Sequence, residues 1–146
     1  MSRIWSLMKH YYLLPLIALI GLSGCDTINY AQYKITNVTV DSSDARKVKT
    51  SLKEVAQETG LEDRLSTSRL PGTLAYYCEP NVQNFRTDLG ARFYGDDILV
   101  DVVAGFGPMT AKYIQVRNLT GRILAKEFGT RVSIPAPLIR IPPVSE

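Results

Sequence analysis

Apolar residues recur along this 146-residue chain at two spacings. In some segments every second residue is apolar, and in others an apolar residue returns about every three and a half residues. Segments with a period near two that are rich in β-branched and aromatic residues predict strands. Residues 98–103 are almost entirely apolar apart from Asp101, which predicts a central strand buried on both faces. The predicted strands span residues 33–40, 73–79, 97–104 and 130–134, and residues 91–94 show an extended pattern before the third of these strands.

Two segments carry apolar residues at helical spacing. The first follows residues 41–43, which are good N-caps, and it ends before Gly60, a residue suited to the left-handed position after a helix. The second spans residues 109–128. Its alternative interpretation, a strand over residues 112–117, agrees less well with the apolar spacing.

The order of these elements, strand, helix, strand, strand, helix, strand, is that of the ferredoxin-like βαββαβ plait. We therefore predict a small α+β domain over residues 33–134, with an antiparallel sheet and two helices on one face. The proline-rich segment 135–146 predicts an extended tail. The plain interpretation of this tail is a loose terminus. The alternative is that its apolar residues, Leu138, Ile139 and Ile141, lie along the domain or dock on a partner.

The first 24 residues have the organisation of a secretory signal peptide. Basic residues Arg3 and Lys9 precede an apolar run from residue 11 to residue 22, which ends in small residues. A helix that spans a bilayer needs about 20 apolar residues. Because this run is shorter and contains Pro15, a cleaved signal peptide over residues 1–24 is the better interpretation.

The residues at the end of this segment, Leu22-Ser23-Gly24-Cys25, resemble the lipobox of bacterial lipoproteins, Leu-(Ala/Ser)-(Gly/Ala)-Cys, at every position. The resemblance implies cleavage between Gly24 and Cys25, a diacylglycerol on the Cys25 sulfur, and a further acyl chain such as palmitate on the new amine. It also implies that membrane lipid holds the domain at the periplasmic face of a membrane. Asp26 resembles the signal for retention at the inner membrane, and residues 25–32 would form an acylated tether.

Removal of residues 1–24 changes which chemistry the chain can perform. This segment contains the only histidine, His10, so the remaining chain has no Ser-His-Asp or Cys-His catalysis and no histidine metal ligand. It also contains two of the 17 basic residues and none of the 14 acidic ones, which lowers the net charge from +3 to +1. A nearly neutral domain argues against nucleic-acid binding, because such binding depends on neutralising many phosphates.

The two cysteines predict no internal disulfide, since Cys25 carries lipid in this interpretation and Cys78 is then alone. Cys78 lies in a strand-like apolar run, and free cysteines are among the most buried residues. We therefore predict a buried, unreactive thiol at Cys78, with a reactive or intermolecular thiol as the alternative.

Acidic residues supply the only candidate set for catalysis or cation binding, namely Glu79, Asp96, Asp97 and Asp101. Asp96 and Asp97 follow Gly95, where a hairpin turn between strands would place acidic residues in any case, so we favour a structural role for them. Asp101 interrupts an apolar strand, so it needs a partner if it is buried. Three basic residues are candidate partners: Arg92, Arg117 and Arg122.

Gly105 and Gly107 precede the second predicted helix, as glycines do in anion-binding loops. Thr110 occupies the position three residues after Gly107, so the third glycine of a dinucleotide-binding fingerprint is missing. These glycines therefore predict a structural turn. We identify no cofactor motif, no metal-binding set and no catalytic residue in the chain.

Together these features favour a non-enzymatic envelope lipoprotein whose domain binds an envelope protein in an assembly, regulatory or structural role. Two alternatives stay open. One is a small carboxylate-dependent enzyme that acts on cell-wall material. The other is a periplasmic lipoprotein that neutralises a toxin.

Overall fold

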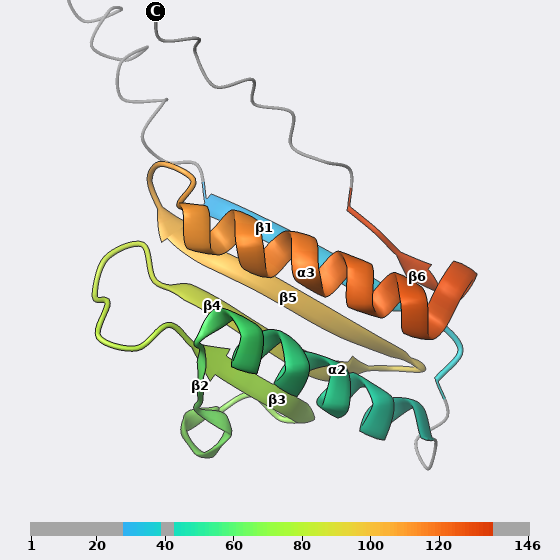
Figure 1. The fold of residues 1–146 in the computed structure, drawn as a ribbon. Helices are drawn as coiled ribbons and strands as arrows, with labels where there is room; N and C mark the ends of the chain where they lie inside the picture. Colours follow the sequence, from blue (N-terminus) through green and yellow to red (C-terminus); the bar gives the residue numbers. More distant parts are fainter. Residues whose placement is uncertain (1–27, 39–42, 136–146) are drawn as a thin grey trace, which may run out of the picture.

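A computed structural model describes residues 28–38 and 43–135 of the chain. The predicted signal peptide, Cys25 and the tail beyond Pro135 lie outside the described residues. The described part is a single antiparallel sheet with two helices on one face (Figure 1). Its helices and strands, in chain order, are β1 (Ile28–Ile35), α2 (Ser43–Thr59), β2 (Glu62–Asp63), the 3-10 helix η1 (Leu65–Thr67), β3 (Thr73–Cys78), β4 (Thr87–Tyr94), β5 (Asp97–Phe106), α3 (Ala111–Phe128), the 3-10 helix η2 (Gly129–Arg131) and β6 (Val132–Ser133).

The strand order is β2-β3-β4-β5-β1-β6, and every neighbouring pair is antiparallel. The predicted α+β class, the antiparallel sheet and the two helices on one face are confirmed. The specific ferredoxin-like plait is not confirmed, because the described sheet has six strands rather than four. The sheet extends beyond β4 through β3 and the two-residue β2, which continues the backbone pairing at that edge.

Both predicted helices are present, and α3 shows why the strand alternative over residues 112–117 is wrong. The Thr110 side chain caps α3 by accepting a hydrogen bond from the Tyr113 backbone N–H at 3.1 Å. At the other end, Gly129 adopts a positive φ of 56° and its N–H bonds to the Ala125 carbonyl. Gly60 likewise follows α2 with a φ of 72°.

Strand β1 begins five residues earlier than predicted, at Ile28 instead of Tyr33. Ala31, Tyr33 and Ile35 point towards the helices and are almost fully buried. The β-branched residues after Ile35 favoured a later strand, but Asn37 adopts a left-handed φ of 57° beyond the end of β1. Residues 28–32, assigned to the tether, therefore belong to the sheet.

The prediction of a strand buried on both faces is wrong in part for β5. The side chains that point to the helices are fully buried, among them Ile98, Val100 and Val102. On the opposite face, Asp101 and Val103 are only partly buried. Strand β5 therefore lies in the interior of the sheet, between β4 and β1, but the helices cover one of its faces only.

Strand β6 has two residues, although residues 130–134 were predicted to form a strand. Its register pairs Ser133 with Lys34, so continuing the ladder would place Pro135 opposite Gln32. The Thr36 N–H bonds to the Arg131 carbonyl at 3.1 Å, so Arg131 is at a hydrogen-bonded position of the ladder. Such positions recur at every second residue of an antiparallel pair, which makes Ser133 and Pro135 the next two. Proline has no N–H to donate at such a position, so the pairing stops before it.

A close contact between Tyr33 and Gly121 seats α3 on the sheet. A Cβ atom added to Gly121 would lie 3.3 Å from the Tyr33 hydroxyl oxygen, so glycine permits this approach. The Tyr33 hydroxyl donates a hydrogen bond to the Arg117 carbonyl of α3 at 2.6 Å. The glycine that weakens the helix by about 1 kcal/mol therefore also lets the helix pack tightly.

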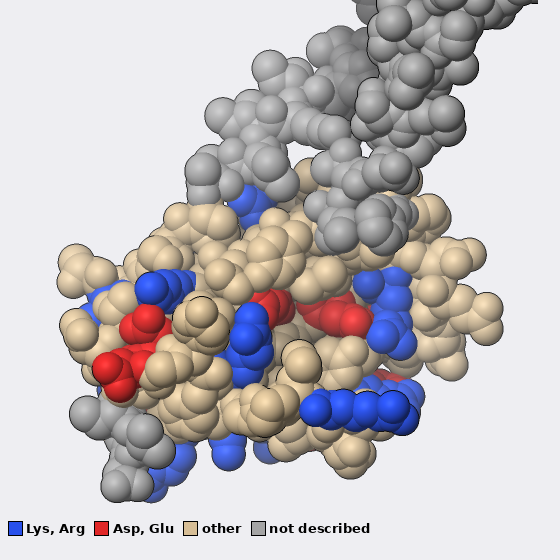
Figure 2. Space-filling model, turned by 180° about the vertical axis from the view of Figure 1, so that it is seen from behind, with Lys and Arg blue, Asp and Glu red and all other residues tan. Residues whose placement is uncertain are grey.

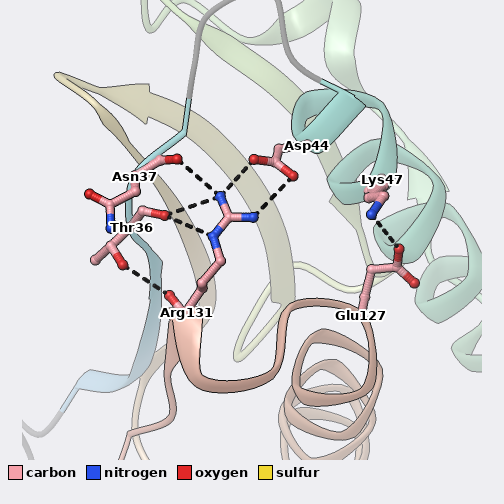
Figure 3. Close-up of polar contacts among 6 residues, drawn as sticks. All are labelled: Thr36, Asn37, Asp44, Lys47, Glu127 and Arg131. Atoms are coloured by element: carbon pink, nitrogen blue, oxygen red, sulfur yellow. Dashed lines mark hydrogen bonds and ion pairs between the residues drawn. The ribbon is translucent and has the colours of Figure 1, made fainter.

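Arg131, which follows α3, connects this part of the chain to the start of α2 and to the residues after β1 (Figure 3). Its guanidinium donates to the Asp44 carboxylate at 2.7 and 3.3 Å and to the Asn37 carbonyl at 3.1 Å. The hydrogen bond from Arg131 lowers the pKa of Asp44. A salt bridge of 3.4 Å between Lys47 and Glu127 links α2 to α3 beside this cluster.

Candidate functional site: the open face of the sheet

In the described part of the chain, neither an α-helix nor a second layer of strands covers the face of the sheet turned away from α2 and α3 (Figure 1). We call it the open face. Alternation along the strands and the register between them identify the side chains that point out of it. They are Tyr30, Gln32 and Lys34 of β1, Leu99, Asp101 and Val103 of β5, Asp88, Arg92 and Tyr94 of β4, and Tyr76 and Cys78 of β3.

Asp101 is the centre of one hydrogen-bond network on this face. Its carboxylate accepts bonds from the Tyr30 hydroxyl at 2.7 Å and the Gln32 amide at 2.8 Å. Arg92 lies 3.6 Å from the other carboxylate oxygen. Arg92 is therefore the partner among the three predicted arginines, whereas Arg117 and Arg122 are on α3, on the far side of the sheet.

A second carboxylate, Asp88, lies in the neighbouring strand. It accepts a hydrogen bond from the Tyr76 hydroxyl at 3.0 Å. Arg86 donates to both of its oxygens, at 2.8 and 3.1 Å, in the bidentate geometry typical of strong arginine–carboxylate pairs. Figure 2 shows the result: acidic side chains near the middle of this face have basic side chains on either side.

A groove of about 430 Å³ runs between the two networks. Gly90 lies between Tyr76 and Asp101 in the register and leaves space where neighbouring positions carry large side chains. A Cβ atom added there would have its nearest neighbours at 3.5 and 3.6 Å, so a small side chain fits without displacing the backbone. The loop between β2 and β3 forms one wall, which includes Thr67, Ser68, Arg69 and Leu70.

Two tyrosines of this face, Tyr30 and Tyr76, are held as hydrogen-bond donors to carboxylates. Burial and the hydrogen bond to Asp101 raise the pKa of Tyr30 to about 12. Burial is also the main cause that raises the pKa of Tyr76. Both hydroxyls are therefore protonated at neutral pH, and each is fixed in direction by a carboxylate. Such preordered side chains lose little further freedom when a partner binds.

Cys78 lies on the same face and is 4% exposed, so its predicted burial is confirmed. Burial raises the pKa of its thiol, which reduces the fraction of reactive thiolate at neutral pH.

The acidic residues singled out from the sequence do not converge. Asp97 pairs with Lys34 at 3.1 Å, and Asp96 is exposed in the β4–β5 hairpin turn, which has Gly95 at a φ of 57° as predicted. The Glu79 carboxylate accepts the Thr87 N–H at 3.2 Å, at the opposite end of the strands. Within residues 28–38 and 43–135, no three acidic, histidine or cysteine side chains could together hold a metal ion.

Gly107 lies in a structural turn before α3, as predicted, whereas Gly105 belongs to β5, which extends to Phe106. Gly107 has a φ of 133°, and the Phe85 ring occupies the space that a Cβ atom of Gly107 would need. The Gly107 carbonyl also accepts a hydrogen bond from the Asn29 side chain at 3.1 Å.

A hollow of about 660 Å³ lies on the helical side and is lined by residues of both α2 and α3. Long charged side chains line it, and Lys47 and Glu127 pair across it. It lacks the ordered hydrogen-bond networks of the open face, so we regard the open face as the candidate site.

Sequence reasoning did not identify Tyr30, Tyr76, Asp88 or Gly90 as site residues. Tyr30 and Gln32 lay in the supposed tether, and the strand pairing that joins these positions is long-range.

No protein-family model matches this chain, and no curated protein is detectably similar to it. Neither helix in the described part of the chain has the length and apolar character needed to cross a bilayer.

Proposed function

We propose that this protein is a lipid-anchored envelope lipoprotein whose domain binds a protein partner through the open face. The lipobox resemblance at Leu22-Ser23-Gly24-Cys25 supports the anchor, and Asp26 supports the inner membrane as its location. Two or more acyl chains would hold the domain essentially permanently, because each buried methylene contributes about 0.8 kcal/mol.

The composition of the open face is the main support for a role in protein binding. Three tyrosines and two arginines gather there, Tyr30, Tyr76, Tyr94, Arg86 and Arg92. Tyrosine and arginine are the residues most enriched in protein-binding hot spots, along with tryptophan. Tyr76 and Arg92 line the groove, and Gly90 adds no side chain to it, a shape that accepts a protruding side chain from a partner.

Site-specific photocrosslinking tests this proposal. Tyr94 is 63% exposed at one end of the open face, and replacement with benzoylphenylalanine keeps an aromatic ring there. The matched control carries the same probe at Gln115, an exposed residue of α3. In intact cells we expect a discrete protein adduct from the Tyr94 probe and none from the Gln115 probe.

A second change makes the test specific for the groove. Gly90→Val places a side chain in the groove at a strand position that accepts a Cβ atom, and β-branched residues favour strands. We expect it to leave the fold intact and to remove the Tyr94 adduct. An adduct that forms equally from Gln115, or that persists with Gly90→Val, argues against the open face as the binding surface.

A further inference from the structure

The start of β1 determines which end of the domain lies nearest to the proposed anchor. Ile28 is the first residue of β1 and pairs with Phe106, the last residue of β5. Only residues 26 and 27 separate Ile28 from Cys25. Three extended Cα steps span about 10 Å, so an acylated Cys25 would hold this end of the sheet against the headgroups.

We call this part of the domain the near end. It consists of residues 80–85, which are the central part of the β3–β4 loop, and residues 105–111, which run from the end of β5 through the turn to the start of α3 (Figure 1). The two segments are in contact, since the Phe85 backbone lies within 3.7 Å of the Cβ position at Gly105.

The near end is uncharged. Neither residues 80–85 nor residues 105–111 contain an acidic or basic side chain. The opposite end carries Asp96 in the β4–β5 turn and the Arg131–Asp44 pair. Because charged groups are expensive to move out of water, the near end is the one that can approach the membrane interior at low free-energy cost.

The charged residues that flank the near end are engaged within the domain. Lys112 donates to the Thr59 carbonyl at 2.6 Å, which ties the start of α3 to the end of α2. Arg86 pairs with Asp88, and Glu79 accepts the Thr87 N–H.

Large apolar side chains are exposed at this end. Phe85 is 40% exposed, and its ring rests against Gly107. Ile114, in the first turn of α3, is 42% exposed. Exposed apolar groups mark surfaces that bind a partner or a membrane, and phenylalanine and aliphatic side chains of membrane-surface segments insert at the boundary between headgroups and acyl chains.

We propose that the near end rests on the bilayer surface, with Phe85 and Ile114 at headgroup depth. This inference rests on the proposed anchor at Cys25. The strands would then run away from the membrane, and the open face would stand beside it, accessible to a periplasmic partner. The lipid surface is a second contact of the domain, separate from the acyl chains themselves.

Tryptophan fluorescence tests this orientation, because the sequence after residue 24 contains no tryptophan. Phe85→Trp places one reporter at the near end, and Tyr94→Trp places a matched reporter at the opposite end, in each case replacing an exposed aromatic residue. The full chain is expressed in bacteria, extracted from membranes and reconstituted in phosphatidylcholine–phosphatidylglycerol vesicles with or without brominated acyl chains.

We expect brominated lipid to quench the Phe85→Trp fluorescence at least twofold and the Tyr94→Trp fluorescence little, with the reverse order for aqueous iodide. Ile114→Trp is an independent near-end reporter if Phe85→Trp folds poorly by circular dichroism. Equal quenching of the near-end and opposite-end reporters in lipidated, vesicle-bound protein would overturn the orientation. Protein whose intact mass shows no lipid contradicts the anchor instead, so the two failures are distinguishable.

Discussion

Two buried tyrosines of the core differ in whether the hydroxyl has a hydrogen-bond partner. This difference predicts that the same substitution lowers the stability at one position and does not lower it at the other. Tyr33 is 2% exposed, and its hydroxyl bonds to the Arg117 carbonyl at 2.6 Å. Tyr113 is fully buried, and its hydroxyl has no hydrogen-bond partner within the part of the chain that the structure describes. Replacement by phenylalanine removes only the hydroxyl in each case.

The expected magnitudes follow from the hydrogen bonds. A net intramolecular hydrogen bond contributes about 1 kcal/mol, so Tyr33→Phe should lower the free energy of unfolding by roughly that amount. A buried polar group without a partner costs about 1–3 kcal/mol. Tyr113→Phe removes that penalty and should leave the free energy of unfolding unchanged or raise it by up to about 2 kcal/mol.

Urea titration followed by far-ultraviolet circular dichroism measures both variants on the chain that begins at residue 26. The dependence on urea concentration should be the same for all three proteins, so the shift in midpoint reports the change in stability. If Tyr113→Phe loses as much stability as Tyr33→Phe, the assignment of the two hydroxyls is wrong.

The pH dependence adds a check on Tyr33. Burial raises its pKa to about 12 from the usual value near 10. A group with a raised pKa contributes its stabilisation fully below the unfolded value and loses it as the pH rises through the folded value. The stability difference between the native chain and Tyr33→Phe should therefore be constant from pH 5 to 9 and shrink between about pH 10 and 12.

Three further perturbations test other parts of the structure. Asp44→Asn should lower the free energy of unfolding by about 1 kcal/mol at pH 7, a modest value because Arg131 is partly exposed; since the folded pKa of Asp44 is lowered, the difference should disappear as urea titrations are taken below about pH 4. Cys78 should react with Ellman's reagent only as the protein unfolds, and fast labelling of the folded chain would contradict its burial. Gly107→Ala should lower the thermal midpoint and displace the Phe85 ring, at a cost of about 1–3 kcal/mol; an unchanged midpoint in calorimetry would show that this turn tolerates a side chain.

Local signals predicted the helices well and the sheet less well. The apolar spacing and the glycines at positions 60 and 129 specify helices through contacts within a few residues, so α2 and α3 were found close to their true limits. Strand β1 was misplaced because β-branched residues 38–40 favour strands, whereas Ile28 joins the sheet only through pairing with Phe106, 78 positions away.

In the candidate site, too, residues with a local sequence signal were predicted, and residues that depend on long-range strand pairing were not. Asp101 was recognised because an acid in an apolar strand needs a partner, and Arg92 was one of the three candidates. Tyr30 and Asp88 gave no comparable local signal. They join the open face only because β1, β5 and β4 align in one register, and no pattern within a single strand specifies that alignment.

The anchor at Cys25 underlies the location, the orientation and the binding role proposed for this protein. Intact-mass spectrometry of the protein extracted from bacterial membranes measures it most directly. We predict a chain that begins at Cys25 and carries the added mass of a diacylglyceryl group, with a further acyl chain on its amine. A mass that retains residues 1–24, or that shows an unmodified Cys25, would contradict it.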